Sequence, residues 1–177
     1  MNVNNVMIDL ETMGNKPGAP VIAIGAVYFD PKSGRMGDEF YKEISLESCV
    51  DAGCKMDAST VLWWLEQSDE ARAKFAKNEQ AGQLLDTLLE FNAFIKGNVK
   101  PWGNGASFDL GILAHCYRLF GIETPWSFWN ERDVRTIVDL DNNNHKGKTV
   151  FDGIPHYALD DAKHQVKYVS AIIQSLK

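Results

Sequence analysis

The sequence has few cysteines and no long apolar run. Cys49, Cys54 and Cys116 are odd in number and form no C-x-x-C pair, so buried or incidental thiols are expected rather than a disulfide framework or a zinc site. No apolar stretch approaches the ~20 residues that a membrane span requires. The first residues show no basic stretch followed by an apolar one, so no signal peptide is evident. We therefore expect a cytoplasmic protein with no membrane partner.

Positive charge is also scarce. The 18 Lys and Arg residues are outnumbered by 24 Asp and Glu residues, which gives a net charge of −6. A large surface for duplex nucleic acid is usually basic, so this balance argues against one. It leaves open a protein that grips only the end of a strand, because few phosphate contacts are then needed and bound metal ions offset acidic side chains.

No repeat, low-complexity tract or linker divides the 177 residues, which predicts a single domain over residues 1–177. The expected strands cover residues 3–8, 21–29, 40–44 and 99–102. The expected helices cover residues 58–67, 71–77, 84–96, 109–120 and 155–175. Residues 133–140 fit either a strand or a helix, and residues 141–153 are expected to form a polar loop. This order predicts an α/β protein in which the first three strands are antiparallel and helices flank a mixed central sheet.

Asp9 and Glu11 flank Leu10 directly after the first predicted strand. On a strand, their side chains point to the same face. Two carboxylates on one face repel unless a cation lies between them, and Mg²⁺ and Mn²⁺ prefer oxygen ligands. The pair is a candidate metal site, although a D-x-E also occurs by chance in a chain this rich in acids.

Asp109 follows a glycine-rich segment and opens a predicted helix. Glycines beside a strand end allow a ligand to approach the backbone closely. Taken alone, Asp109 is better explained as the N-cap of that helix, because Asp is preferred there.

His156 and Asp161 form an H-x-x-x-x-D pattern at the start of the last predicted helix, which would bring the two side chains to one side of it. Asp160 and Asp161 are also what a helix dipole favours in a first turn, and His156 alone is more simply a surface histidine. Together with the earlier acids, however, these residues make up the set needed for two-metal hydrolysis of a phosphodiester. Two ions stabilise the attacking and leaving oxygens, and a histidine accepts the proton of water.

Three motifs resemble those of the DEDDh exonucleases, a family of the ribonuclease H-like superfamily. DLETMG resembles the first and supplies Asp9 and Glu11, GASFD resembles the second and supplies Asp109, and HYALDDA resembles the third and supplies His156 and Asp161. Many relatives have Asn-Ala-x-Phe-Asp in the second motif, whereas Gly105 takes the asparagine position here. The segments STVLWWLEQSDEAR and WGNGASFD further resemble the subgroup of phage-type exodeoxyribonuclease A and the mycobacterial-type 3′→5′ exoribonuclease.

The resemblance implies a metal-dependent 3′→5′ exonuclease that releases nucleoside monophosphates from single-stranded ends, with DNA slightly favoured over RNA. It implies two Mg²⁺ or Mn²⁺ ions, a homodimer, and His156 as the general base. Asp9, Glu11 and Asp161 would hold one ion, while Asp9 and Asp109 would serve the second. Thr12 and Met13 would meet the terminal nucleotide.

Two tryptophans and a group of lysines are further candidates for substrate binding. Trp63 and Trp64 are adjacent on a helix and point about 100° apart, so both cannot face one core, and one of them could stack on a base. Lys146 and Lys148, with Lys163 and Lys167, are either a solvated surface or a short basic strip for phosphates. The other functions considered are a ribonuclease H-like endonuclease and a nucleic-acid-binding or proofreading-accessory module without catalysis, both of which the His and acid set disfavours.

Overall fold

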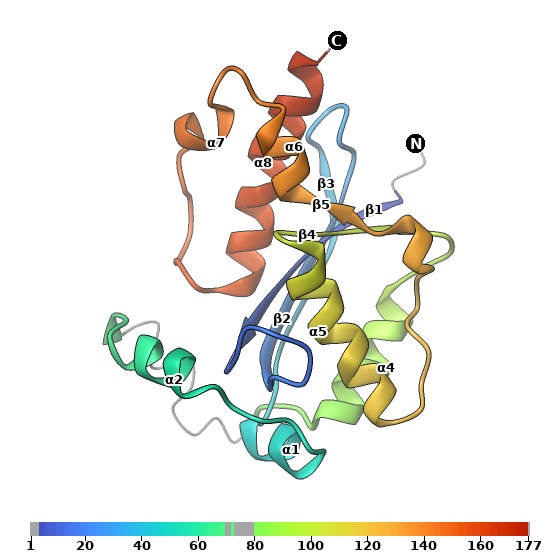
Figure 1. The fold of residues 1–177 in the computed structure, drawn as a ribbon. Helices are drawn as coiled ribbons and strands as arrows, with labels where there is room; N and C mark the ends of the chain where they lie inside the picture. Colours follow the sequence, from blue (N-terminus) through green and yellow to red (C-terminus); the bar gives the residue numbers. More distant parts are fainter. Residues whose placement is uncertain (1–3, 70–71, 73–79, 177) are drawn as a thin grey trace.

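The computed structural model describes residues 4–69, 72 and 80–176. A central sheet runs through the molecule, with helices on both faces (Figure 1). The helix predicted over residues 71–77 lies outside the described residues except for Arg72.

The sheet has five strands in the order β3-β2-β1-β4-β5. β1 (Asn5–Thr12), β2 (Val21–Phe29) and β3 (Met36–Glu43) form an antiparallel meander. β4 (Lys100–Gly103) and β5 (Arg132–Asp133) add to β1 in parallel. The predicted mixed sheet is confirmed, and β1 continues past its predicted end to include Asp9 and Glu11.

The two faces of β1 bury different side chains. Val6, Ile8 and Leu10 belong to the cluster that packs against α4 (Leu84–Phe94) and α5 (Ala106–Leu119). Met7 belongs to the cluster on the other face, beneath α8 (Ala158–Ser175). Because side chains alternate along a strand, Asp9 and Glu11 lie on the face that α8 covers.

Gly25 on β2 allows α8 to approach the sheet closely. It pairs with Asp9 in the register of β1 and β2. A Cβ atom at this position would lie 2.2 Å from the backbone carbon of Ala158, which no side chain can tolerate. The missing side chain therefore lets the first turn of α8, with Asp161, rest directly beside Asp9.

The remaining elements are short and lie around the sheet. They are α1 (Leu46–Asp51), α2 (Ala58–Leu65), the 3₁₀ helix η1 (Phe128–Asn130), α6 (Val134–Asp139) and α7 (His145–Lys148). The ambiguous segment 133–140 is thus the end of β5 followed by α6. The predicted loop 141–153 is wrong in part, because Asn144 accepts a hydrogen bond from the amide of Gly147 and begins α7.

The last helix begins at Ala158 and not at Pro155, so that boundary was wrong. His156 has a φ of 61°, a left-handed conformation that cannot continue into a right-handed helix. Asp160 stabilises the turn before the helix, since its Oδ2 accepts a hydrogen bond of 2.9 Å from the amide of Ile154. Among the described residues, no helix is long and apolar enough to cross a membrane.

Candidate active site

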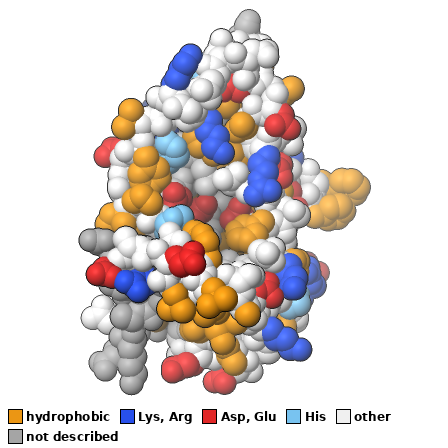
Figure 2. All heavy atoms as spheres, turned by 60° about the vertical axis from the view of Figure 1, so that its left-hand side comes forward, with side chains coloured by type: hydrophobic (Ala, Val, Ile, Leu, Met, Phe, Trp, Pro, Cys, Tyr) orange, Lys and Arg blue, Asp and Glu red, His pale blue; other side chains and the backbone are white. Residues whose placement is uncertain are grey.

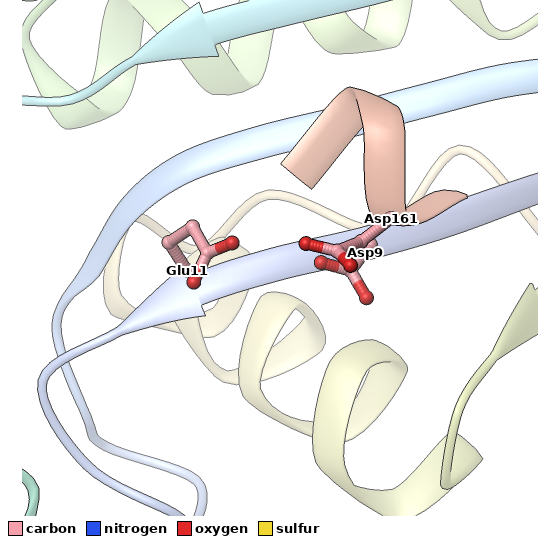
Figure 3. Close-up of side chains that lie close together, drawn as sticks. All are labelled: Asp9, Glu11 and Asp161. Carbon is pink, nitrogen blue, oxygen red and sulfur yellow. The ribbon is translucent and has the colours of Figure 1, made fainter. Parts of the chain in front are cut away.

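Three carboxylates meet where the C-terminal half of β1 passes the first turn of α8. Asp9, Glu11 and Asp161 each place an oxygen within 4.8 Å of the others, and Figure 3 shows Asp161 descending from α8 onto Asp9. Glu11 is buried, whereas Asp9 and Asp161 are partly exposed. Three oxygen ligands at this separation fit a hard divalent cation.

Asp109 on α5 lies behind this group and is 1% exposed. Its Oδ1 accepts a hydrogen bond of 3.3 Å from the amide of Leu10, the residue between the two acids of β1. Its buried Oδ2 has no hydrogen-bond partner among the described residues. The explanation of Asp109 as an N-cap is wrong, because α5 begins at Ala106 after the left-handed Gly105. A buried oxygen without a donor fits a site for a cation.

Burial raises the pKa of every acid in the cluster, and repulsion among the cluster's carboxylates adds to the rise at Asp9 and Glu11. The pKa of Glu11 rises to about 8, mainly through burial and then through the charges of Asp161 and Asp109. Burial also raises the pKa of Asp109 to about 7, against hydrogen bonds from the amides of Asn104 and Leu10. The pKa of Asp9 is raised well above its usual range by burial and by the other three carboxylates. The cluster therefore retains protons at neutral pH unless cations replace them.

Gln165 is a member of the site that sequence reasoning missed. It lies one turn after Asp161 on α8 and is 4% exposed. Its Nε2 donates a hydrogen bond of 2.7 Å to Oδ1 of Asp9, while its buried Oε1 has no partner in the described part of the chain. The i,i+4 spacing from Asp161 was visible in the sequence, but the contact with Asp9 is a property of the fold.

His156 lies in the turn before α8 rather than on the helix. Its ring packs edge-on against Trp63 at 5.0 Å and against Trp64 at 5.9 Å between centroids. Burial raises the pKa of Asp161, and both the charge and the backbone amide of His156 oppose that rise. The histidine is thus held between α2 and the acidic cluster, whereas Asp160 is turned away to the amide of Ile154.

The two tryptophans of α2 have different environments. Trp64 is 4% exposed, and its Nε1 donates a hydrogen bond of 2.9 Å to the carbonyl oxygen of Thr12. Met13 is 7% exposed and packs with Trp64 and Ile22 in a small cluster. Trp63 is 42% exposed. Of the pair, Trp63 has the surface that a nucleobase could cover.

The candidate basic residues lie on α7 and α8. Lys146 and Lys148 on α7 are exposed, and Nζ of Lys146 is 5.8 Å from the centre of the Tyr168 ring. Lys163 pairs with Glu39 at 2.8 Å and Lys167 with Asp152 at 3.5 Å. The latter two lysines already have acidic partners, which leaves Lys146 and Lys148 as the candidates for phosphate binding.

The surface over the cluster is hollowed. Figure 2 shows acidic side chains at the bottom of a recess, with hydrophobic side chains and a histidine at its margin. Cations bound to the acidic floor could contact anionic groups of a ligand, and the apolar margin could contact flat apolar groups of the same ligand.

Known proteins share this fold and sequence pattern. A family model described as the 3′-5′ exoribonuclease Rv2179c-like domain matches residues 4–173. An exodeoxyribonuclease of Enterobacteria phage T4 is 31% identical over 159 residues, which cover 75% of this chain and 70% of the phage protein.

Two solved structures illustrate the likeness of fold. The nuclease domain of 3′hExo, a DEDDh family member bound to rAMP, gives a TM-score of 0.58 at 13% identity and covers 97% of this chain and 92% of its own. Pop2p of S. pombe, in its Mg²⁺ and Mn²⁺ bound form, gives 0.59 at 15% identity over 96% and 82% of the two chains. The fold is therefore ribonuclease H-like, with a mixed sheet and flanking helices.

Proposed function

This chain belongs to the 3′-5′ exoribonuclease Rv2179c-like domain family and is a 3′→5′ exonuclease, and from that premise we propose that it releases nucleoside monophosphates from single-stranded ends by two-metal hydrolysis. The observation that carries the proposal is the convergence of Asp9, Glu11 and Asp161 beside the unpartnered Oδ2 of Asp109. Such a cluster repels itself unless cations are present.

The four acids divide between two ions. Asp9, Glu11 and Asp161 would hold one, and Asp9 with Asp109 would hold the other. When bound, two Mg²⁺ or Mn²⁺ ions stabilise the charges of the attacking and leaving oxygens and increase the acidity of water. Each of the four carboxylates comes from a rigid strand or helix, which fixes their mutual positions before substrate arrives.

His156 is proposed as the general base. It stands at the edge of the acidic cluster beside Asp161, and an imidazole is the side chain best suited to accept a proton from the attacking water. Trp63 and Trp64 contact the ring edge-on, so α2 orients the base. A group that stacks on the exposed surface of Trp63 would lie next to His156.

The strand end would be bound by Thr12, Met13 and the tryptophans of α2. Trp63 is the proposed stacking platform, while Trp64 supports it and holds the backbone of Thr12. Stacking requires bases that are free of a partner strand, so single strands should be preferred over blunt duplex.

DNA is the substrate we favour, because the phage relative is an exodeoxyribonuclease. RNA ends are the second candidate, and the description of the matching family favours them. Hydrolysis of matched DNA and RNA strands, labelled at either end, separates these two candidates. The same labels distinguish release of mononucleotides from the internal cuts of an endonuclease.

Metal dependence and His156→Ala test the mechanism together. We expect no hydrolysis in EDTA, recovery with Mg²⁺ or Mn²⁺, and a loss of ~10²–10⁴-fold in kcat for His156→Ala. Mn²⁺ affinity of that variant, measured by calorimetry, should change much less than its rate. Full activity in EDTA would exclude the metal mechanism, and a wild-type kcat for His156→Ala would exclude the assigned base. A protein inactive with every metal and substrate would instead be a binding module.

A further inference from the structure

Arg135 on α6 lies at the margin of the acidic cluster, in the space left by the missing side chain of Gly105. A Cβ atom at Gly105 would come within 2.8 Å of the guanidinium carbon and within 3.1 Å of both terminal nitrogens. Gly105 also has a φ of 97°, which side chains rarely adopt. Glycine at this position therefore permits the guanidinium to rest directly on the backbone that starts α5.

Asp133 fixes this arrangement. Its Oδ2 accepts a hydrogen bond of 2.7 Å from the amide of Ala106, and its Oδ1 accepts one of 2.8 Å from the amide of Arg135. One carboxylate thus ties the start of α6 to the start of α5. Asp133 is in turn held in the sheet, where it pairs with Gly103 of β4.

The topology brings Arg135 to the same edge of the sheet as the acids. β1, β4 and β5 are parallel, so their carboxyl ends meet at one edge, where ligands commonly bind in such sheets. β1 supplies Asp9 and Glu11 there, Asp109 follows β4, and Arg135 follows β5. The positive charge of Arg135 reaches Asp109, whose pKa burial raises and Arg135 helps to lower.

The guanidinium has unused hydrogen-bonding capacity. Arg135 is exposed, and the interaction of its charge within the described residues is electrostatic attraction to Asp109, which leaves its N–H donors facing solvent. A planar fork of N–H donors beside a cluster of carboxylates that can hold metal ions matches two oxygens of one phosphate.

We propose that Arg135, positioned by Gly105 and Asp133, forms a phosphate-binding site for the nucleic-acid strand beside the acidic cluster. The inference rests on the proposed function, because it assumes a phosphodiester substrate. The guanidinium would donate hydrogen bonds to the non-bridging oxygens of a backbone phosphate as the strand enters the recess over the acidic cluster. The metal ions held by the acids would then be free to act on the phosphate whose bond is cleaved, because Arg135 would bind a different phosphate.

The test compares Arg135→Gln with Arg118→Gln, which removes the same charge from the exposed far end of α5. Binding of an oligothymidylate with phosphorothioate linkages is measured by fluorescence anisotropy across a salt series in Mg²⁺. Arg135→Gln should weaken binding about 10- to 100-fold, the usual range for a hydrogen bond to a charged group. The slope of log Kd against log salt should fall by about 0.7. Arg135→Lys should recover the slope but only part of the affinity, because lysine cannot donate in a fork.

A second measurement separates phosphate binding from an indirect effect through Asp109. Mn²⁺ affinity, measured by calorimetry without nucleic acid, should be unchanged or tighter in Arg135→Gln, since a neighbouring positive charge is removed. Arg135→Gln with the Kd and salt slope of Arg118→Gln would overturn the proposal. So would a parallel loss of Mn²⁺ affinity, which would make Arg135 a positioning residue for Asp109. Failure of the proposed function looks different, because the wild-type protein would then show no metal-dependent release of mononucleotides.

Discussion

At the scale of single residues, the negative charges of the clustered carboxylates repel one another in the metal-free protein. Glu11 is 8% exposed, and its pKa rises from 4.5 to about 8 on folding. The folded protein therefore holds a proton over this interval that the unfolded chain has released. Its contribution to stability is complete below about pH 4.5 and is lost as the pH rises through about 8.

Glu11→Gln should flatten this pH dependence. Because the amide carries no titrating proton, the variant should lose less stability than the wild type between about pH 5 and 8. Urea unfolding in EDTA at several pH values measures the effect. Glu66→Gln, an exposed position at the end of α2, serves as the control and should follow the wild type. If the free energy of unfolding changed equally with pH in all three proteins, the raised pKa of Glu11 would be contradicted.

Gln165 offers a second prediction at this scale. Its hydrogen bond to Oδ1 of Asp9 orients that carboxylate and leaves the other oxygen free for a cation. Residues that orient metal ligands in this way typically contribute 10- to 100-fold to metal affinity. Gln165→Leu should therefore weaken Mn²⁺ binding about 10- to 100-fold in calorimetry. Gln174→Leu, an exposed position on the same helix, should bind Mn²⁺ as the wild type does, and equal affinities for all three would refute the role.

At the scale of elements, we expect α2 to divide its adjacent tryptophans between substrate and core, because Trp63 is 42% exposed and Trp64 is 4% exposed. Trp63→Ala should raise KM about 5- to 150-fold, which corresponds to ~1–3 kcal/mol for stacking on one base, with little change in the free energy of unfolding. Trp64→Ala removes a buried ring and the hydrogen bond to Thr12, so it should lower that free energy by ~3–5 kcal/mol. Steady-state kinetics and urea unfolding of both variants distinguish the roles. Equal effects of the two substitutions on KM and on stability would contradict the division.

The elements also show how far sequence patterns reach. Short apolar runs correctly predicted β1 and β2, which are buried on both faces, and apolar residues at helical spacing correctly predicted the long helices, which bury one face. Helix starts were harder to predict. Pro155 and Asp109 carry local preferences for a helix start, but the left-handed conformations of His156 and Gly105 determine where α8 and α5 begin.

The candidate site was predictable to the same extent. Its acids and histidine were found because they occur in short motifs at characteristic spacings. Gln165 and Arg135 were not, because their importance comes from tertiary contacts. Gln165 bonds a residue 156 positions away, and the guanidinium of Arg135 occupies the space that a side chain at Gly105 would fill. No local pattern records either contact.

At the scale of the whole molecule, an acidic protein has to hold a polyanion. The net charge of −6 repels a long strand, so binding depends on local cations and on the metal ions. Lys163 and Lys167 are already paired with Glu39 and Asp152. Lys146 and Lys148 on α7 are exposed, and Lys146 stands over Tyr168 on α8. These two lysines are the predicted contacts for phosphates outside the recess.

Lys146→Ala combined with Lys148→Ala should raise KM for long strands more than for short ones, because only long strands extend beyond the recess. The slope of log KM against log salt should fall by ~0.7 for each phosphate that the lysines no longer neutralise. The matched control is Lys32→Ala with Lys96→Ala, which removes the same charge at the β2–β3 turn and the end of α4. Steady-state kinetics over a salt series on strands of two lengths measure both quantities. If net charge alone governed binding, the two double variants would weaken it equally, whereas local phosphate contacts on α7 require a larger effect from the Lys146 and Lys148 pair.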